Sequence, residues 1–299
     1  VTGVTVNRFC GSSMQAIHMA AGAIQMNAGE AFICAGVESM TRVPIMGFNP
    51  MPNPALFDRY PQAYVSMGET AENVAVKYEL SRSEQDTFAE HSHQKAVAAR
   101  IAGQLADEII PIVTASGTVD QDGCIRPETT LEKLAELKPA FDEDGTVTAG
   151  TASPLTDGAS AVLICTQEYA DRVGLEPLAV IKGIATYGCQ PELMGLGPTG
   201  ATQKALSRAG IGTEDLDVIE LNEAFAAQAL ANIRDLGLNT DKINLDGGAI
   251  AIGHPLGATG ARITGKVAQL LRRQGGRYGL ATQCIGGGQG IATVLETIR

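Results

Sequence analysis

The sequence contains no tryptophan, and aromatic residues make up only 4% of its 299 positions. A hydrophobic core therefore has to be built mainly from alanine, valine, isoleucine and leucine. Hydrophobic residues nevertheless reach 44% and charged residues 18%, which is the composition of a folded globular protein rather than a disordered one. The 35 glycines indicate many tight turns and close approaches between backbone segments.

Positive charge is scarce, because 22 lysine and arginine residues stand against 33 aspartate and glutamate residues, a formal net charge of −11. A chain this acidic is a poor nucleic-acid binder, and it can hold an anionic ligand only in a local basic pocket. The sequence shows no apolar run long enough for a membrane span and no recognisable signal peptide. We therefore expect a cytoplasmic protein that is not integral to a membrane and has no nucleic-acid partner.

Closely spaced cysteines are also missing, although the chain has six scattered cysteines: Cys10, Cys34, Cys124, Cys165, Cys189 and Cys284. The wide spacing argues against a zinc ribbon and against a secreted disulfide framework, so we expect free thiols in a reducing compartment. The pair His91-Ser-His93 offers only two potential metal ligands within a polar helix. We interpret both as surface histidines and expect no metal site.

The first 39 residues alternate between strand and helix signals. The chain begins at Val1 without a methionine, and residues 4–6 are typical of a strand already under way, so we expect several dozen residues upstream. Hydrophobic periodicity predicts a helix over residues 12–27 that Gly29 ends. Residues 31–37 then read as a buried strand.

The middle of the chain has a different character. Prolines cluster between residues 44 and 61, and strand signals are few. Two helices are predicted there, at residues 70–78 and 83–102, and Ser81-Arg-Ser-Glu84 has the chemistry of a capping box at the start of the second helix. We interpret this region as an irregular domain inserted into the main fold.

The final part returns to alternating strands and helices. The pattern predicts strands at residues 159–165, 179–185, 218–221, 243–245, 278–283 and 290–297, and helices at residues 198–209, 223–236 and 257–274. Strand, turn, helix and strand follow one another around Cys10 and again around His254, which favours an α/β fold of two similar halves. We divide the chain into four parts: the start of the N-terminal half (1–39), an inserted loop domain (40–152), a return to the N-terminal half (153–175) and the C-terminal half (176–299).

Cys10 is the first candidate for chemistry because it lies at the N-terminus of a predicted helix. The helix dipole and the free N–H groups there favour a thiolate, so we expect a lowered thiol pKa. A thiolate is a natural nucleophile toward thioesters. The alternative is an inert, buried core cysteine, which is the commoner situation for a free cysteine.

Two glycine-rich turns in the C-terminal half strengthen the catalytic interpretation. One contains His254 within Gly247–Gly260, and the other is Cys284-Ile-Gly-Gly-Gly-Gln-Gly290. Glycines let a substrate approach the backbone and leave N–H groups free to bind an oxyanion. Asn222 follows a predicted strand and opens a predicted helix, so an ordinary N-cap role is an equal alternative for it.

Four motifs resemble the active-site motifs of the thiolase family, and they occur in family order. They are Val6-Asn-Arg-Phe-Cys-Gly-Ser-Ser-Met-Gln-Ala16, Asn222-Glu-Ala-Phe-Ala226, Gly253-His-Pro-Leu-Gly257 and Cys284-Ile-Gly-Gly-Gly288. The resemblance runs over nearly the whole chain. It is strongest to bacterial thiolases of the type that forms the β-subunit of the fatty-acid oxidation complex.

The resemblance implies a role for each motif. Cys10 would be the acyl-accepting nucleophile, His254 its base, and Cys284 the second acid and base, acting at the α-carbon of acetyl-CoA. Asn222 would hold a water that forms one oxyanion hole with His254. The backbone N–H groups of Cys10 and Gly286 would form the other.

Contacts with coenzyme A are also implied. Arg126 would contact the nucleotide part, and together with Lys133 and Lys138 it would give the inserted domain a basic patch. An ordinary solvated surface is the alternative for these three residues.

The resemblance places Ser153 on the pantetheine arm and Met67 and Phe225 among the substrate contacts. Many short-chain biosynthetic thiolases carry a histidine before the Met-Gly pair, whereas this chain has Ser66. This difference favours a broader degradative enzyme.

The expected fold is a layered α/β/α/β/α thiolase fold, and the expected assembly is a homodimer or a dimer of dimers that could also bind a hydratase/dehydrogenase α-subunit. The expected activity is cleavage of 3-ketoacyl-CoA in fatty-acid β-oxidation, with coenzyme A as substrate and no tightly bound cofactor. The alternatives are a biosynthetic acetoacetyl-CoA thiolase, a ketoacyl synthase, and a non-catalytic acyl-CoA or lipid-binding relative. Decarboxylating ketoacyl synthases use two active-site histidines, whereas only His254 lies in the C-terminal half here.

Overall fold

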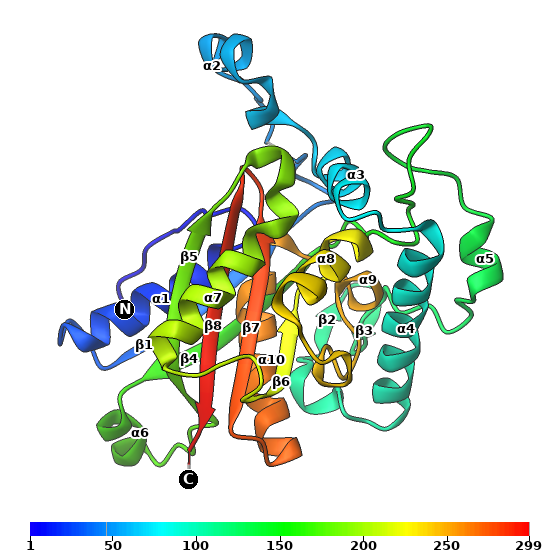
Figure 1. Cartoon of the computed structure of the whole chain (residues 1–299). Coiled ribbons are helices and arrows are strands. Elements are labelled where there is room, and N and C mark those ends of the chain that lie inside the picture. Colours follow the sequence, from blue (N-terminus) through cyan, green and yellow to red (C-terminus); the bar gives the residue numbers. More distant parts are fainter. Residues whose placement is uncertain (46, 299) are drawn as a thin grey trace.

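A computed structural model describes residues 1–45 and 47–298 (Figure 1). Its centre is a mixed four-stranded sheet in the order β5-β8-β7-β6. The strands are β5 (Ala179–Gly188), β6 (Leu216–Leu221), β7 (Tyr278–Ile285) and β8 (Gln289–Thr297). β6 runs parallel to β7, and β7 and β8 form an antiparallel hairpin. Because β6, β7 and β8 are buried along most of their length, both faces of this sheet must be covered.

Helices cover the sheet on its two faces (Figure 1). α7 (Gly197–Ala209) and α8 (Ala226–Leu236) pack on one face. On the other face lie α1 (Ser12–Gln25) and α10 (Leu256–Gln274), and α10 also contacts a second sheet made of β1 (Ala31–Glu38) and β4 (Gly158–Cys165). Sheet and helix layers therefore alternate, with α10 between the two sheets.

The β1–β4 sheet joins the two ends of the inserted region. β1 pairs with β4 in antiparallel register, from Ala31 opposite Cys165 to Glu38 opposite Gly158. The inner face packs against α10, but Ile33 and Val37 on the outer face are 76% and 75% exposed. The prediction that this strand is buried is therefore wrong for every second residue.

Helices are the main regular elements of the inserted region. Its elements are α2 (Pro54–Arg59), α3 (Met67–Lys77), α4 (Arg82–Ile101), the short pair β2 (Ile112–Thr114) and β3 (Gly117–Val119), and α5 (Leu131–Ala135). α2 projects away from the rest of the fold (Figure 1). Short helices α6 (Gln167–Val173) and α9 (Ala249–Ile252) lie outside this region.

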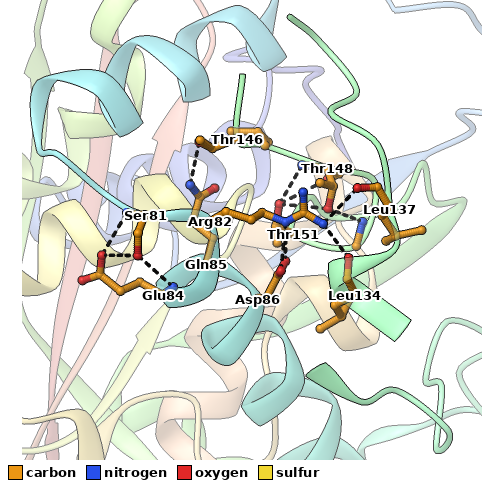
Figure 2. A network of polar contacts seen from close by, with 12 residues as sticks. Ser81, Arg82, Glu84, Gln85, Asp86, Leu134, Leu137, Thr146, Thr148 and Thr151 are labelled. Atoms are coloured by element: carbon orange, nitrogen blue, oxygen red, sulfur yellow. Dashed lines mark hydrogen bonds and ion pairs between the residues drawn. The ribbon is translucent and has the colours of Figure 1, made fainter. Parts of the chain in front are cut away.

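A polar network fixes α4 to the segment that leads back to the main fold (Figure 2). The capping box predicted at Ser81 and Glu84 is confirmed. Arg82, the first residue of α4, pairs with Asp86 at 2.9 Å and donates to the backbone oxygens of Leu134 and Leu137 at 2.5 and 3.0 Å. These bonds satisfy carbonyls at the end of α5 and hold the following loop in place.

Three predictions about local structure are wrong. Residues 4–6 are not a strand, because no neighbouring strand among the described residues pairs with them. Residues 243–245 form only one bridge, between Ile243 and Ile219, because Asn244 turns the chain with a φ of 46°. The helix predicted from residue 223 begins only at Ala226, so Asn222 is not its N-cap.

A single glycine lets α1 and α10 approach closely. A Cβ atom at Gly260 would lie only 2.4 Å from the backbone nitrogen of Met14, closer than van der Waals contact allows. Ser13 reinforces the contact, since its hydroxyl accepts a hydrogen bond from the Ala261 N–H at 2.9 Å. Cys10 precedes α1 and His254 precedes α10, so this close packing brings together the ends of the helices from which both residues extend.

Candidate active site

Cys10 lies at the end of a tight turn that leads into α1. Phe9 adopts a left-handed backbone conformation with a φ of 45°, which is rare for a bulky residue and points to a constrained turn. The hydroxyl of Ser12 closes the turn, because it donates to the Phe9 carbonyl at 2.7 Å and accepts from the Arg8 N–H at 2.9 Å. Cys10 therefore lies at the N-terminus of a helix, as the sequence predicts.

The surroundings of the Cys10 thiol do not lower its pKa, contrary to the expectation from the helix dipole. Burial raises the pKa of Cys10 to about 11, and the negative charge of Glu38 adds to the rise. Hydrogen bonds from the backbone N–H groups of Gly286 and of Cys10 itself act in the opposite direction. Desolvation outweighs the helix terminus here, and the two N–H groups assigned to an oxyanion hole both lie at the sulfur.

His254 is buried between α10 and the end of β6. Its ring Nδ1 is 2.6 Å from the Thr259 hydroxyl, and its Nε2 is 3.4 Å from Nδ2 of Asn222. Its backbone N–H donates to the Thr156 hydroxyl at 3.1 Å. Burial, helped by the positive charge of Arg262, lowers the pKa of His254 to about 3, so the imidazole is neutral and able to accept a proton.

Asn222 continues the line of β6 beyond the end of the strand. Its backbone N–H donates to the carbonyl of Thr282 on β7 at 3.0 Å. Its side-chain nitrogen faces His254, and its Oδ1 is buried without a hydrogen-bond partner among the described residues. Such an unsatisfied oxygen is costly in a folded core, and this one lies beside the imidazole of His254.

Cys284 lies near the end of β7 and is fully buried. Burial raises the pKa of Cys284 well above its usual value, and the nearby Cys10 raises it further. The preceding residue, Gln283, donates from Nε2 to the carbonyl oxygen of Cys10. Adjacent residues of β7 therefore hold two parts of the site: Thr282 bonds Asn222, and Gln283 bonds the turn at Cys10. Asn222 and Cys10 thus lie at the same end of the sheet.

An apolar wall adjoins Cys284. Phe225 packs edge-on against Phe141, with ring centroids 5.8 Å apart, and belongs to the same buried cluster as Cys284 and the partly buried Met67. The backbone N–H of Ser153 donates to the carbonyl of Ala224 at 3.0 Å. The structure therefore brings three of the predicted substrate contacts, Met67, Ser153 and Phe225, to the neighbourhood of Cys284.

The predicted basic contact Arg126 lines a cavity of about 170 Å³ together with Lys133 and His93. Lys138, the third residue of the predicted basic patch, is not among the lining residues. His93 is buried and accepts a hydrogen bond from the Arg126 N–H at 3.3 Å, so its assignment to the surface is wrong. Among residues 1–45 and 47–298, no group of three or more histidine, cysteine or acidic side chains is arranged to hold a metal ion.

Sequence reasoning missed three residues that contact this site. Thr259 bonds His254, Gln283 bonds Cys10, and Glu38 accepts a hydrogen bond from the Gly257 N–H at 3.0 Å while its charge acts on Cys10. Glu38 carried a signal, since it is an acidic residue at the end of a predicted strand. The other two sit inside apolar elements, where a polar side chain more often makes a local structural bond.

Two thiols, a neutral imidazole and paired backbone N–H groups lie at one end of a layered α/β fold, and these are groups of the kind that acyl transfer uses. The family models agree: the thiolase N-terminal domain matches residues 1–168 and the thiolase C-terminal domain matches residues 175–297. The chain belongs to the thiolase family. None of its described helices is long and apolar enough to cross a membrane.

Individual relatives support this assignment. A 3-ketoacyl-CoA thiolase from Shewanella oneidensis is 53% identical over 304 residues, covering 99% of this chain and 78% of the relative. An acetyl-CoA acetyltransferase from Chromobacterium violaceum is 48% identical, covering 98% of this chain and 79% of the relative. The crystal structure of human mitochondrial 3-ketoacyl-CoA thiolase in complex with CoA superposes with a TM-score of 0.90 at 42% identity, covering 98% of this chain and 78% of that chain. The predicted thiolase fold is confirmed, whereas the division of the chain into four parts remains a prediction.

The raised pKa of Cys10 predicts how its alkylation depends on pH. The thiolate is the reactive form, so the rate of iodoacetamide labelling at Cys10 should rise about tenfold per pH unit from pH 7 to 10 without a plateau near neutrality. Glu38→Gln keeps an oxygen for Gly257 but removes the charge, and should shift the curve to lower pH. Mass analysis of the Cys10 peptide measures the rate, and a plateau below pH 8 would contradict the raised pKa.

Proposed function

We propose that the chain is a 3-ketoacyl-CoA thiolase, which uses free CoA to cleave 3-ketoacyl-CoA into acetyl-CoA and a shortened acyl-CoA through an acyl-Cys10 intermediate. The observation that carries the proposal is the meeting of Cys10, Cys284 and the Gly286 N–H at one point, next to the end of β6 where Asn222 faces a neutral His254. One thiol forms the covalent bond and the other is placed to move a proton.

In the first half of the reaction, the Cys10 sulfur attacks the 3-keto carbonyl and its proton passes to His254 Nε2. A neutral thiol and a neutral imidazole suit this transfer, because the proton moves only as the bond forms. The N–H groups of Cys10 and Gly286 stabilise the oxyanion. The C2–C3 bond then breaks, and the departing enolate of acetyl-CoA takes its proton from Cys284.

In the second half, free CoA attacks the acyl-Cys10 thioester. The CoA thiol gives its proton to the Cys284 thiolate left by the first half. The tetrahedral intermediate expels the Cys10 sulfur, which recovers its proton from the imidazolium of His254. Asn222, through its buried Oδ1 and its contact with His254, would hold a water beside the thioester oxygen of acetyl-CoA.

The acyl-CoA would extend from this point past Met67, Phe225 and Ser153 toward the cavity lined by Arg126 and Lys133. Those two cations give an acidic protein the local positive charge that the phosphates of CoA require. CoA acts here as a substrate. The enzyme is expected to work in the cytoplasm in fatty-acid β-oxidation, as a homodimer or dimer of dimers, with a hydratase/dehydrogenase subunit as a further partner.

The proposed function is tested by adding CoA to 3-ketoacyl-CoA of four and of eight carbons in the presence of the chain. Equimolar acetyl-CoA and shortened acyl-CoA from the eight-carbon substrate, at a rate at least equal to that with four carbons, is the expected result. Cleavage of the four-carbon substrate alone would instead favour a biosynthetic acetoacetyl-CoA thiolase, the activity in the name of the Chromobacterium relative. Binding of both substrates without cleavage would favour a non-catalytic acyl-CoA-binding relative.

A further inference from the structure

The two ring nitrogens of His254 face different kinds of partner. Nδ1 lies 2.6 Å from the hydroxyl oxygen of Thr259, and Nε2 lies 3.4 Å from the side-chain nitrogen of Asn222. The amide nitrogen of asparagine carries only donor hydrogens. With the amide in this orientation, the nitrogen that faces it accepts the hydrogen bond, which favours Nε2 as the unprotonated nitrogen of the neutral ring.

The hydrogen bonds of Thr259 agree with this arrangement. Its hydroxyl has one hydrogen, which it donates to the carbonyl of Pro255 at 3.1 Å. The hydroxyl oxygen is then left to accept, and the group that can donate to it is the Nδ1–H of His254. A chain of hydrogen bonds thus runs from His254 Nδ1 to Thr259 and on to Pro255, and every polar atom in it is satisfied.

We propose that Thr259 is a positioning residue that holds His254 in the Nδ1–H tautomer and so presents a bare Nε2 to the reacting sulfur. The role of Nε2 as the base rests on the proposed function, whereas the tautomer rests on the hydrogen bonds alone. Thr259 lies in the first turn of α10, where the helix begins at Leu256, directly after the His254-Pro255 step. The rigid helix therefore carries the group that orients the ring.

The same contact has a second consequence during the reaction. When Nε2 accepts the proton of Cys10, the ring becomes an imidazolium with N–H groups on both nitrogens. Thr259 continues to accept from Nδ1, so no group has to reorganise when the charge appears. A valine at this position would leave a buried N–H without a partner, which favours the other tautomer and places a hydrogen on Nε2.

α10 supplies a matched control at Thr264. Its buried hydroxyl donates to the carbonyl of Gly260 at 2.7 Å, which is the same local bond that Thr259 makes to Pro255, but Thr264 does not bond His254. Thr259→Val and Thr264→Val therefore remove the same kind of helix bond, and only the first removes the partner of the imidazole. Thr259→Ser keeps the hydroxyl and serves as the rescue variant.

The first readout is the rate at which Cys10 becomes acylated by an acyl-CoA. Thr259→Val is expected to lower this rate by about 10- to 100-fold, less than the roughly 10⁴-fold loss when a charged orienting partner is changed in a serine protease. Thr259→Ser and Thr264→Val are expected to react at rates close to that of the parent chain. A parent-like rate in Thr259→Val would overturn the proposal, and so would an equal loss in Thr264→Val.

The second readout does not depend on activity. NMR of the ¹⁵N-histidine-labelled chain, with the His254 signals identified by their loss in His254→Asn, reports which ring nitrogen is protonated. The expected result is a protonated Nδ1 in the parent and in Thr259→Ser, and loss of that preference in Thr259→Val. A protonated Nε2 in the parent overturns the proposal. The expected tautomer in a chain that never acylates Cys10 would instead count against the proposed function and leave the effect of Thr259 on the tautomer standing.

Discussion

Replacing His254 with asparagine should slow acylation of Cys10 by about 10²- to 10⁴-fold, the range of a lost general base. The effect is expected to be large because the Cys10 thiol, with a pKa of about 11, is nearly all protonated at neutral pH. Without a base beside it, attack has to wait for the small thiolate fraction. Single-turnover mass measurement of the acyl adduct gives the rate directly.

The acylation rate of the His254→Asn variant should also depend on pH in a characteristic way. This rate should climb with pH toward the pKa of Cys10, because hydroxide replaces the missing base. The parent should be less dependent on pH, since a histidine with a pKa near 3 stays neutral throughout the neutral range. His91→Asn, on the exposed side of α4, is the control and should match the parent. Equal rates in the parent and in His254→Asn at pH 7 would remove His254 from the mechanism.

Replacing Cys284 with alanine should separate the two thiols by function. Exchange of the α-protons of acetyl-CoA with D₂O is expected to fall by about 10²- to 10⁴-fold, because the substitution removes the group proposed to move the proton at the α-carbon. Acylation of Cys10 from an acyl-CoA breaks no C–C bond, and its leaving group is the CoA thiolate, a much weaker base than an enolate. This rate should therefore fall far less than the exchange rate, although Cys284 also protonates the departing CoA. The two rates are read from deuterium incorporation and from intact mass.

Burial makes the second thiol suited to this task. The high pKa of Cys284 keeps its proton in place until the carbanion of the leaving enolate, a much stronger base, removes it. Cys165→Ala is the control, because Cys165 lies at the far end of β4 opposite Ala31. Equal loss of acylation and exchange in Cys284→Ala, on a folded protein, would mean that the two thiols do not have separate roles.

The sequence alone located most of the elements that hold this site. Periodicity and end signals predicted α1, α4, α7 and α10 within a few residues of their observed bounds. α10 has a pronounced apolar stripe, whereas α4 is a polar helix whose start was located by its capping box. The strand predicted at residues 243–245 is wrong. An asparagine between two apolar residues fits the pattern of a short strand, and that pattern does not show that Asn244 turns the chain. Such a conformation depends on its tertiary bonds to β6, and the pattern of residue types does not contain them.

The sequence predicted the protonation states and hydrogen bonds of the site less well than it predicted which residues form it. The position of Cys10 at a helix N-terminus predicted a lowered thiol pKa. The pKa also depends on how completely the fold removes water from the thiol, and burial raises it by more than the helix terminus lowers it. The N-cap interpretation of Asn222 failed because residues 223–225 separate it from α8, whose N-cap position is occupied by Phe225. The hydrogen bond from His254 to Thr259 required three-dimensional geometry, because a threonine in the first helical turn also has an ordinary structural role.

The central claim is that Cys10 carries the acyl group. Intact-mass analysis of the parent chain and of Cys10→Ser, each incubated with 3-ketoacyl-CoA without added CoA, tests it most directly. The account predicts an acyl adduct on the parent alone, located at Cys10 and released when free CoA is added. No adduct on a parent chain with intact secondary structure, or the same adduct on Cys10→Ser, would contradict it.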